Sequence, residues 1–574
     1  MVSIADIRTW RPGELDGAFD ALTIRRDTLI GLDDELAGAR APDGWIGAAA
    51  NAAAASHDTL SERARRIVAG VSAVRRATGE ISDTVLAIQR ALGEAVDLAR
   101  AYGFAVADDG TVTDVHPPTI ADPVQAEEVA RERRIVRDEV VDRLEQILRR
   151  AEDVDADFAA VLGRAARGEI DDGSGSSLAG ASATGQGAGG LSTIGPPENG
   201  TPGDNAGWWS ALSEDERQAL IDSDPGALGN LDGLPATVRD EANRARIDDE
   251  RAALETERDR LQADLDDNWF GGTFTNADAA LEHLNAKLAA LDRIEQTLDQ
   301  PGGRQLLLLD LSGERAEAAV AVGDVDTADH VAAFTPGLGS TVDGSLEGYD
   351  KDMELLRQQA ETESRRYGDG GSVATVTWIG YQAPQPALGG WNPLGNPLSS
   401  DSVVHDDLAK AGGADLAEFY RGIDASRTTD PHLTALGHSY GSTTTGFALQ
   451  EQTGVDDAVF FGSPGLGASH SSEIQVAEGH IYRIEARNDI VADAGQFGID
   501  PTYVDGVTGL SARAETLPDG RRLAESTGHS AYLAQDSTSQ YNMSVVVAGL
   551  PDRRVEDDGR GLGDITSWPV PGTY

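Results

Sequence analysis

The chain has 574 residues, which is too long for one ordinary domain and predicts two to four. Its 40% hydrophobic and 25% charged residues are typical of a globular protein, and its formal net charge of −50 argues against nucleic acid or an anionic membrane surface as an electrostatic partner. The absence of cysteine excludes disulfides, thiol catalysis and thiolate metal sites.

The start of the sequence carries no sign of a secretory leader. The segment MVSIADIRTWRPGELDG has no basic region followed by an apolar stretch, and no run of about 18 apolar residues occurs elsewhere. We therefore expect a cytoplasmic protein, or one that is exported without a cleaved signal peptide.

Residues 1–168 predict an all-helical domain. Apolar residues recur at helical spacing over residues 15–36 and again over 67–92, and APDGWIGAAA breaks the pattern between them. ADDGTVTD then indicates a turn or small hairpin. Asp122-Pro123 has the form of an N-cap followed by proline at the first helical position, and opens a further helix.

The next segments differ sharply in composition. Gly, Ser, Ala and Pro dominate residues 169–205, which predicts a flexible linker between independently folded units. Residues 206–300 return to helical patterns and are expected to form a lead-in, lid or flank. Trp208 and Trp209 in this stretch favour a role as packing anchors.

From residue 301 the pattern becomes α/β. Short apolar runs such as RQLLLLDL, HVAAFTPG, SVATVTWIGY, HLTALGHS, DAVFFGSPG and HIYRIEARND alternate with helical segments. Apolar strands that alternate with helices predict a mostly parallel sheet covered on both faces, so residues 301–574 are expected to be the catalytic domain. Sites in such sheets form at the carboxyl ends of the strands.

The segment GHSYGST contains a candidate nucleophile. Ser439 follows the strand HLTAL and precedes a helical stretch, and it fits the pattern G-x-S-x-G. Gly437 and Gly441 keep Cβ atoms out of a tight turn, so that the serine oxygen can project above the sheet.

A serine needs a base and an acid, and enzymes with this turn carry them in the order serine, acid, histidine. Three histidines follow Ser439, and His529 is the one that also follows the acid candidates, which makes it the predicted base. Asp489 is the predicted acid because it follows the strand IYRIEA and so reaches the carboxyl edge. Asp493 remains the alternative acid, and Asp500 is weaker.

The oxyanion of an acyl-transfer reaction needs hydrogen-bond donors. The backbone N–H of Tyr440, the residue after the nucleophile, is the first predicted donor. The second is the N–H of Leu338, in the glycine-rich loop TPGLGST that follows the strand HVAAF. No metal-binding motif and no phosphate-binding loop is present, so neither a metal nor a cofactor is predicted.

Several motifs resemble an actinobacterial α/β-hydrolase family formerly described as a domain of unknown function. They are WWSALSEDERQALI, GLPATVRDEANR, TPGLGST, WIGYQAP, GHSYGS, FGSPG, ARNDIVA and GHSAYL, spread over residues 206–550. The resemblance implies an α/β-hydrolase fold, a Ser439–Asp489–His529 triad and esterase- or lipase-like hydrolysis of an ester or lipid substrate.

The first 110 or so residues resemble the WXG-type helical hairpins associated with type VII secretion. Trp45-Ile46-Gly47 lies at the break between two long helices, where the tryptophan is expected to pack into the helix crossing and the glycine to permit the turn. That family's export tail is not matched, since Tyr102 is followed four residues later by Val106. The resemblance gives an alternative role, in which the helical domain binds a helical protein partner and the hydrolase is exported cargo or a toxin.

Overall fold

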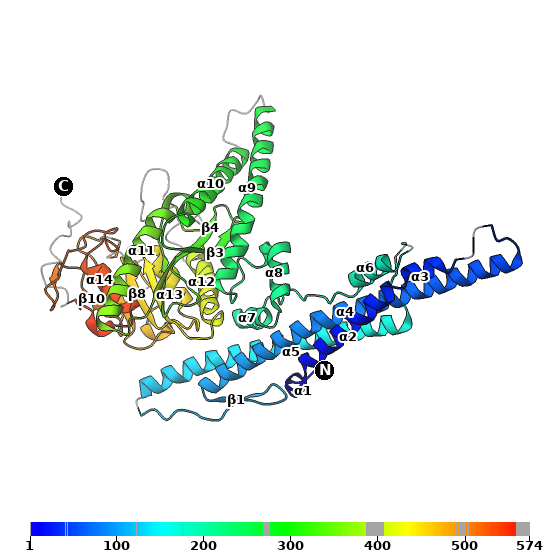
Figure 1. The fold of residues 1–574 in the computed structure, drawn as a ribbon. Helices are drawn as coiled ribbons and strands as arrows, with labels where there is room; N and C mark the ends of the chain where they lie inside the picture. Colours follow the sequence, from blue (N-terminus) through cyan, green and yellow to red (C-terminus); the bar gives the residue numbers. More distant parts are fainter. Residues whose placement is uncertain are drawn as a thin grey trace, which may run out of the picture. The chain divides into compact units, whose positions relative to one another are not determined.

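The computed structural model describes residues 2–40, 42, 44–121, 123–173, 175, 177–267, 276–385, 407–489, 491–492, 501 and 504–557. The chain forms two compact units, one of Met1–Thr119 with Val136–Leu220 and the other of Ile120–Ile135 with Ile221–Tyr574. Figure 1 shows long helices in the first unit and a helix-covered sheet in the second. No helix among the described residues is long and apolar enough to cross a membrane.

The first unit is a helical assembly, as predicted. Its elements are α1 (Ile4–Thr9), α2 (Pro12–Ile30), α3 (Asp33–Gly38), α4 (Ala48–Ala101), the antiparallel hairpin β1 (Phe104–Val106) and β2 (Val112–Asp114), α5 (Pro123–Arg167) from Val136 onward, α6 (Leu178–Ala188), α7 (Pro202–Ser210) and α8 (Glu214–Ser223) as far as Leu220. The apolar stripes of α4 and α5 form its core, where Ile88, Leu92, Val140 and Leu144 are buried.

The prediction of a flexible linker over residues 169–205 is wrong for its central part. Residues 178–188 form α6, capped at its start by the Ser177 side chain. Its small residues allow close contact with α4: Ser182 Oγ lies 2.9 Å from Ser72 Oγ, and a Cβ on Gly185 would stand 2.2 Å from Ala69 O. The Gly, Ser and Ala residues therefore serve a tight helix–helix contact.

The boundary expected at residue 206 also differs, because α7 belongs to the first unit. Gly207 packs so closely on α5 that a Cβ there would lie 2.6 Å from Arg143 Cα. Trp208 and Trp209 are buried, and the Trp208 indole N–H donates to Ile194 O at 2.9 Å. The two tryptophans are thus packing residues of the helical unit.

The Trp45-Ile46-Gly47 segment is only partly as expected. Gly47, at φ +115°, adopts a backbone conformation that favours glycine where α4 begins. Trp45 is 49% exposed and Ile46 88% exposed, so the expectation that this tryptophan packs into the helix crossing is wrong. The adjacent start of α4, AAANAAAAS, has no large apolar side chain to cover an indole. The WXG-type resemblance stays a prediction.

The second unit contains an eight-stranded, mostly parallel sheet. Its strands lie in the order β10-β9-β8-β7-β5-β6-β4-β3, and only the pairs β3–β4 and β4–β6 are antiparallel. The strands are β3 (Arg304–Asp310), β4 (Glu317–Val322), β5 (His330–Thr335), β6 (Val373–Ile379), β7 (His432–His438), β8 (Asp457–Phe461), β9 (Ile481–Ile484) and β10 (Thr508–Leu510). A small hairpin of β11 (Glu515–Thr516) and β12 (Arg522–Leu523) follows.

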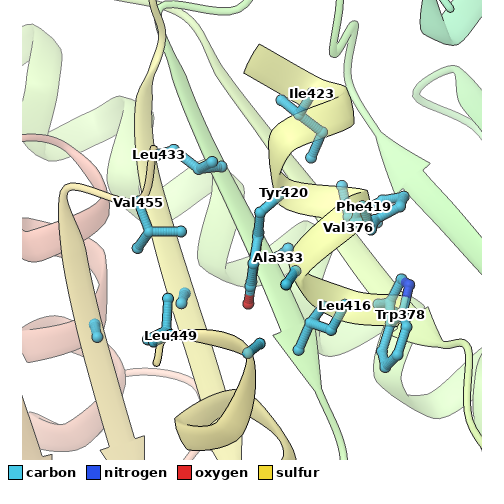
Figure 2. Packing of buried hydrophobic residues seen from close by; sticks show 14 of the residues in the cluster. Ala333, Val376, Trp378, Leu416, Phe419, Tyr420, Ile423, Leu433, Leu449 and Val455 are labelled. Atoms are coloured by element: carbon cyan, nitrogen blue, oxygen red, sulfur yellow. The ribbon is translucent and has the colours of Figure 1, made fainter. Parts of the chain in front are cut away.

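Helices cover both faces of this sheet. Successive residues of β5 point to opposite sides, so Ala333 packs with α12 (Asp407–Ala425) while Phe334 packs with α11 (Val342–Tyr367) and α14 (Thr538–Val547). Figure 2 shows the α12 side chains that meet the sheet around Ala333, namely Leu416, Phe419, Tyr420 and Ile423. The predicted α/β fold with a covered parallel sheet is confirmed.

The helices α9 (Ala236–Asp267) and α10 (Asn276–Leu298) lie at the β3 edge of the sheet. In α9, the Asn243 side-chain amide donates to Leu306 O at 3.1 Å, and Asp240 accepts from Leu306 N at 2.7 Å. Leu291 and Ile294 of α10 join the core below β3 and β4. The described parts of these helices therefore flank an edge strand.

Candidate active site

Ser439 occupies a strained turn between β7 and α13 (Tyr440–Ala448). Its backbone has φ +54° and ψ −131°, a conformation that residues other than glycine rarely adopt. A Cβ on Gly437 would lie 2.8 Å from Ser442 Cα, and one on Gly441 would lie 2.3 Å from Thr335 O. Glycine is thus required on both sides of the serine, at the carboxyl end of β7, as the sequence predicts.

His529 joins Ser439 to Asp489. Its Nε2 lies 2.7 Å from Ser439 Oγ, and its Nδ1 lies 2.9 and 3.0 Å from the two carboxylate oxygens of Asp489. A carboxylate only accepts, so Nδ1 carries the proton and Nε2 is left to accept from the serine hydroxyl. The three residues predicted from chain order meet in one hydrogen-bonded row.

Asp489 is a buried carboxylate held by several donors. It accepts from Val491 N at 3.0 Å and Ala492 N at 3.2 Å, and from the Tyr532 hydroxyl at 2.6 Å. Burial alone would raise the pKa of Asp489, but the hydrogen bonds from His529, Tyr532 and Ala492 outweigh it and hold the pKa below the ordinary value. The carboxylate stays ionised beside His529. Asp493 and Asp500 lie outside the described residues.

The other two histidines that follow Ser439 lie elsewhere. His480 comes immediately before β9, and its Nδ1 contacts Asp457 Oδ1 at 2.8 Å, at the amino ends of the strands. His470 is exposed and begins a short turn. Only His529 among the three reaches the serine.

The loop after β5 lies against the serine turn. A Cβ on Gly337 would stand 2.6 Å from Ser439 Cβ and 2.9 Å from Tyr440 N, so the two backbones touch at this position. Within the described part of the chain, no protein acceptor pairs with the N–H of Leu338, whereas Gly339 N donates to Pro384 O at 2.8 Å. The two predicted oxyanion donors, Tyr440 and Leu338, therefore lie on adjoining segments.

Comparison with known proteins shows which family this chain resembles. Residues 312–499 match the model of an alpha/beta hydrolase family. An uncharacterized protein of Mycobacterium bovis is 35% identical over 241 residues, which make up 40% of this chain and 86% of that protein. The chain belongs to the alpha/beta hydrolase family.

Other similar proteins match different fractions of this chain. An uncharacterized protein of Mycobacterium tuberculosis is 28% identical over 404 residues, or 63% of this chain and 58% of that protein. Among solved structures, an arylesterase has a TM-score of 0.27 at 13% identity, covering 51% of this chain and 97% of its own. A hyperthermophilic esterase from Pyrobaculum calidifontis has a TM-score of 0.28 at 11% identity, covering 52% and 97%.

Three further residues of the hydrolase surround the triad, and no sequence pattern marks them as part of the site. Tyr532 donates to the acid, and His438 contacts the backbone of the base, with Nε2 2.9 Å from His529 O. Gly462, in the FGSPG motif, has φ +57°, and a Cβ there would lie 3.0 Å from an Asp489 oxygen and 3.2 Å from His529 Cε1. The three residues lie in the motifs GHSAYL, GHSYGS and FGSPG, but their spacing in the sequence does not indicate these contacts.

Tyr381, in the WIGYQAP motif, reaches the oxyanion loop. Its hydroxyl donates to Pro336 O at 2.7 Å, and its ring stacks on that of Tyr440 with centroids 6.4 Å apart. The ring of Tyr440 is fixed in turn, since its hydroxyl accepts from Ala409 N at 3.1 Å. Aromatic packing thus holds together the two segments that carry Leu338 and Tyr440.

Proposed function

We propose that this hydrolase cleaves a carboxylic ester or a lipid acyl ester through a covalent acyl-serine intermediate. The observation that carries the proposal is the unbroken row from Ser439 Oγ to His529 Nε2 at 2.7 Å and from His529 Nδ1 to Asp489 at 2.9 Å. Such a row makes an otherwise weak hydroxyl nucleophilic at neutral pH.

Acylation begins when Ser439 Oγ attacks the ester carbonyl carbon and its proton passes to His529 Nε2. Asp489 holds the imidazole in the tautomer that can accept this proton and stabilises the imidazolium that forms. The imidazolium then gives the proton to the leaving alcohol oxygen as the C–O bond breaks, which leaves the acyl group on Ser439.

The tetrahedral intermediate carries negative charge on the former carbonyl oxygen. The backbone N–H groups of Tyr440 and Leu338 donate to this oxygen, and each such donor lowers the barrier by roughly 3 kcal/mol. Water then attacks the acyl-serine with His529 as the base, and the carboxylic acid leaves. The adjoining backbones at Gly337 and Tyr440 support this assignment.

Covalent labelling tests the proposal directly. A fluorophosphonate probe should label the wild type, and Ser439→Ala should abolish labelling and lower hydrolysis of short and long acyl p-nitrophenyl esters by roughly 10⁴- to 10⁶-fold. Ser469→Ala, at an exposed serine of the same unit, is the matched control and should label like the wild type. Equal labelling of Ser439→Ala and wild type would disprove the assignment.

A further inference from the structure

Tyr532 makes a contact that the mechanism above does not use. Its hydroxyl donates to Asp489 Oδ2 at 2.6 Å and accepts from Ala486 N at 2.9 Å. The residue is 1% exposed, so no water competes for these bonds. The tyrosine therefore ties the acid to the backbone at the end of β9.

The same short segment supplies both the base and this hydroxyl. His529 and Tyr532 are three residues apart, and both reach Asp489, which comes from a different loop. Gly462 makes room for the Asp489 and Tyr532 side chains, because a Cβ at this position would lie 3.0 Å from both Asp489 Oδ2 and Tyr532 Cε2. Tyr532 thus packs directly against the acid–base pair.

The hydroxyl can act only as a donor to this carboxylate. Burial and then the negative charge of Asp489 raise the pKa of the Tyr532 phenol above its ordinary value, so it stays protonated throughout the working pH range. A protonated hydroxyl beside a buried carboxylate forms a short, charge-assisted hydrogen bond.

We propose that Tyr532 is a positioning residue that fixes the Asp489 carboxylate against His529 and sets how readily the imidazole takes the Ser439 proton. The inference rests on the proposed acyl-serine function. Without the tyrosine hydroxyl, the carboxylate has one donor fewer and attracts the proton on His529 more strongly.

The rate at which a fluorophosphonate modifies Ser439, measured against pH in the full-length chain, reports this effect without knowledge of the natural substrate. In Tyr532→Phe, the midpoint of the rising limb should move up by about half a pH unit, which is about a threefold rate loss on that limb. The plateau rate should fall roughly tenfold because the acid is held less firmly.

The matched control is Tyr541→Phe, in α14. Tyr541 is also a buried tyrosine, 2% exposed, but its hydroxyl donates to Arg553 O at 3.1 Å, away from the triad. The Tyr541→Phe variant should lose stability as Tyr532→Phe does, but its labelling rate should keep the wild-type pH profile. A profile for Tyr532→Phe that matches the control would overturn the proposal.

Two further arms make the test specific to Asp489. In an Asp489→Asn background, Tyr532→Phe should cause no additional rate loss, and a full additional loss would show that the tyrosine does not act through the acid. If Tyr532→Phe does not fold, 3-fluorotyrosine at position 532 keeps the hydroxyl and strengthens the donor. It should move the midpoint to lower pH, and an unmoved midpoint would count against the proposal.

The two proposals fail in distinguishable ways. If the acyl-serine function is wrong, the wild type shows no labelling that depends on Ser439. If only the role of Tyr532 is wrong, the wild type labels at Ser439 and the profiles of wild type, Tyr532→Phe and Tyr541→Phe coincide.

Discussion

His438 stands directly before the nucleophile, yet it is a neutral imidazole enclosed by rings. Its ring centroid lies 4.9 Å from that of His529 and 5.1 Å from that of Phe461, and its Nε2–H donates to the His529 carbonyl at 2.9 Å. Burial, and then the charge that His529 can carry, lowers the pKa of His438 to about 4.

This lowered pKa predicts a specific loss of stability in acid. Between the unfolded value of 6.5 and the folded value of about 4, the unfolded chain binds a proton at His438 that the folded chain does not. The stability that the neutral ring contributes is therefore present above pH 6.5 and is lost as the pH falls toward 4, by up to about 3 kcal/mol.

His438→Gln tests this prediction, because the glutamine amide keeps an N–H donor and does not titrate. Urea unfolding at pH 7.5 and pH 4.5 should show a smaller loss of unfolding free energy in the variant than in the wild type. Equal losses in the two proteins would show that the wild-type ring is already charged in the folded state at pH 4.5.

The sequence predicts the three triad residues better than it predicts the neighbouring side chains that hold them in place. Ser439, Asp489 and His529 follow from a turn motif, a strand end and chain order, which are local or ordinal features. His438 contacts the backbone carbonyl of a residue 91 positions away, and Tyr532 contacts the side chain of a residue 43 positions away. No local sequence pattern indicates either contact. Such contacts arise from the way the loops meet above the sheet.

Among the elements, α6 shows how composition alone misleads. A stretch rich in Gly, Ser and Ala has the composition of a flexible linker, but small residues also permit two helices to approach closely. Gly185 in α6 and Gly189 directly after it face α4, where a Cβ on either would stand 2.2 Å from a backbone oxygen, that of Ala69 or Ala73 respectively. The strands of the sheet in the second unit, by contrast, could be predicted, because long apolar runs that alternate with helices are typical of a buried parallel sheet.

Two neighbouring glycines of α6 provide a matched pair of variants. Gly185→Ala places its methyl group against the Ala69 backbone and should destabilise the helical unit by about 1–3 kcal/mol. Gly187 has open space where a Cβ would lie, so Gly187→Ala should be neutral or stabilise α6 by up to about 1 kcal/mol.

Limited proteolysis distinguishes the two variants. Cleavage within residues 169–200 should be faster in Gly185→Ala than in the wild type, and no faster in Gly187→Ala. Equal, rapid cleavage in all three proteins would mean that α6 is not docked on α4 in solution.

For the molecule as a whole, the dominant physical fact is charge. The chain has 97 acidic and 47 basic residues, for a formal net charge of −50. Many of the arginines pair with carboxylates, as Arg150 pairs with Glu216 and Arg304 pairs with Asp350. With about two acidic residues for every basic one, however, most acidic side chains must repel one another, and this repulsion opposes the compact state.

Salt should therefore stabilise this protein. Raising NaCl from 0.1 M to 1 M shortens the screening length from about 10 Å to about 3 Å, which weakens repulsion between exposed carboxylates more than it weakens the buried ion pairs. We expect the midpoint of thermal unfolding to rise by several degrees over this range, and KCl to act like NaCl because screening does not depend on the identity of the cation. An unfolding midpoint that falls with salt would instead mean that attraction between exposed arginines and carboxylates outweighs the repulsion expected from the net charge. A midpoint that rises with only one of the two salts would indicate specific binding of that salt's cation.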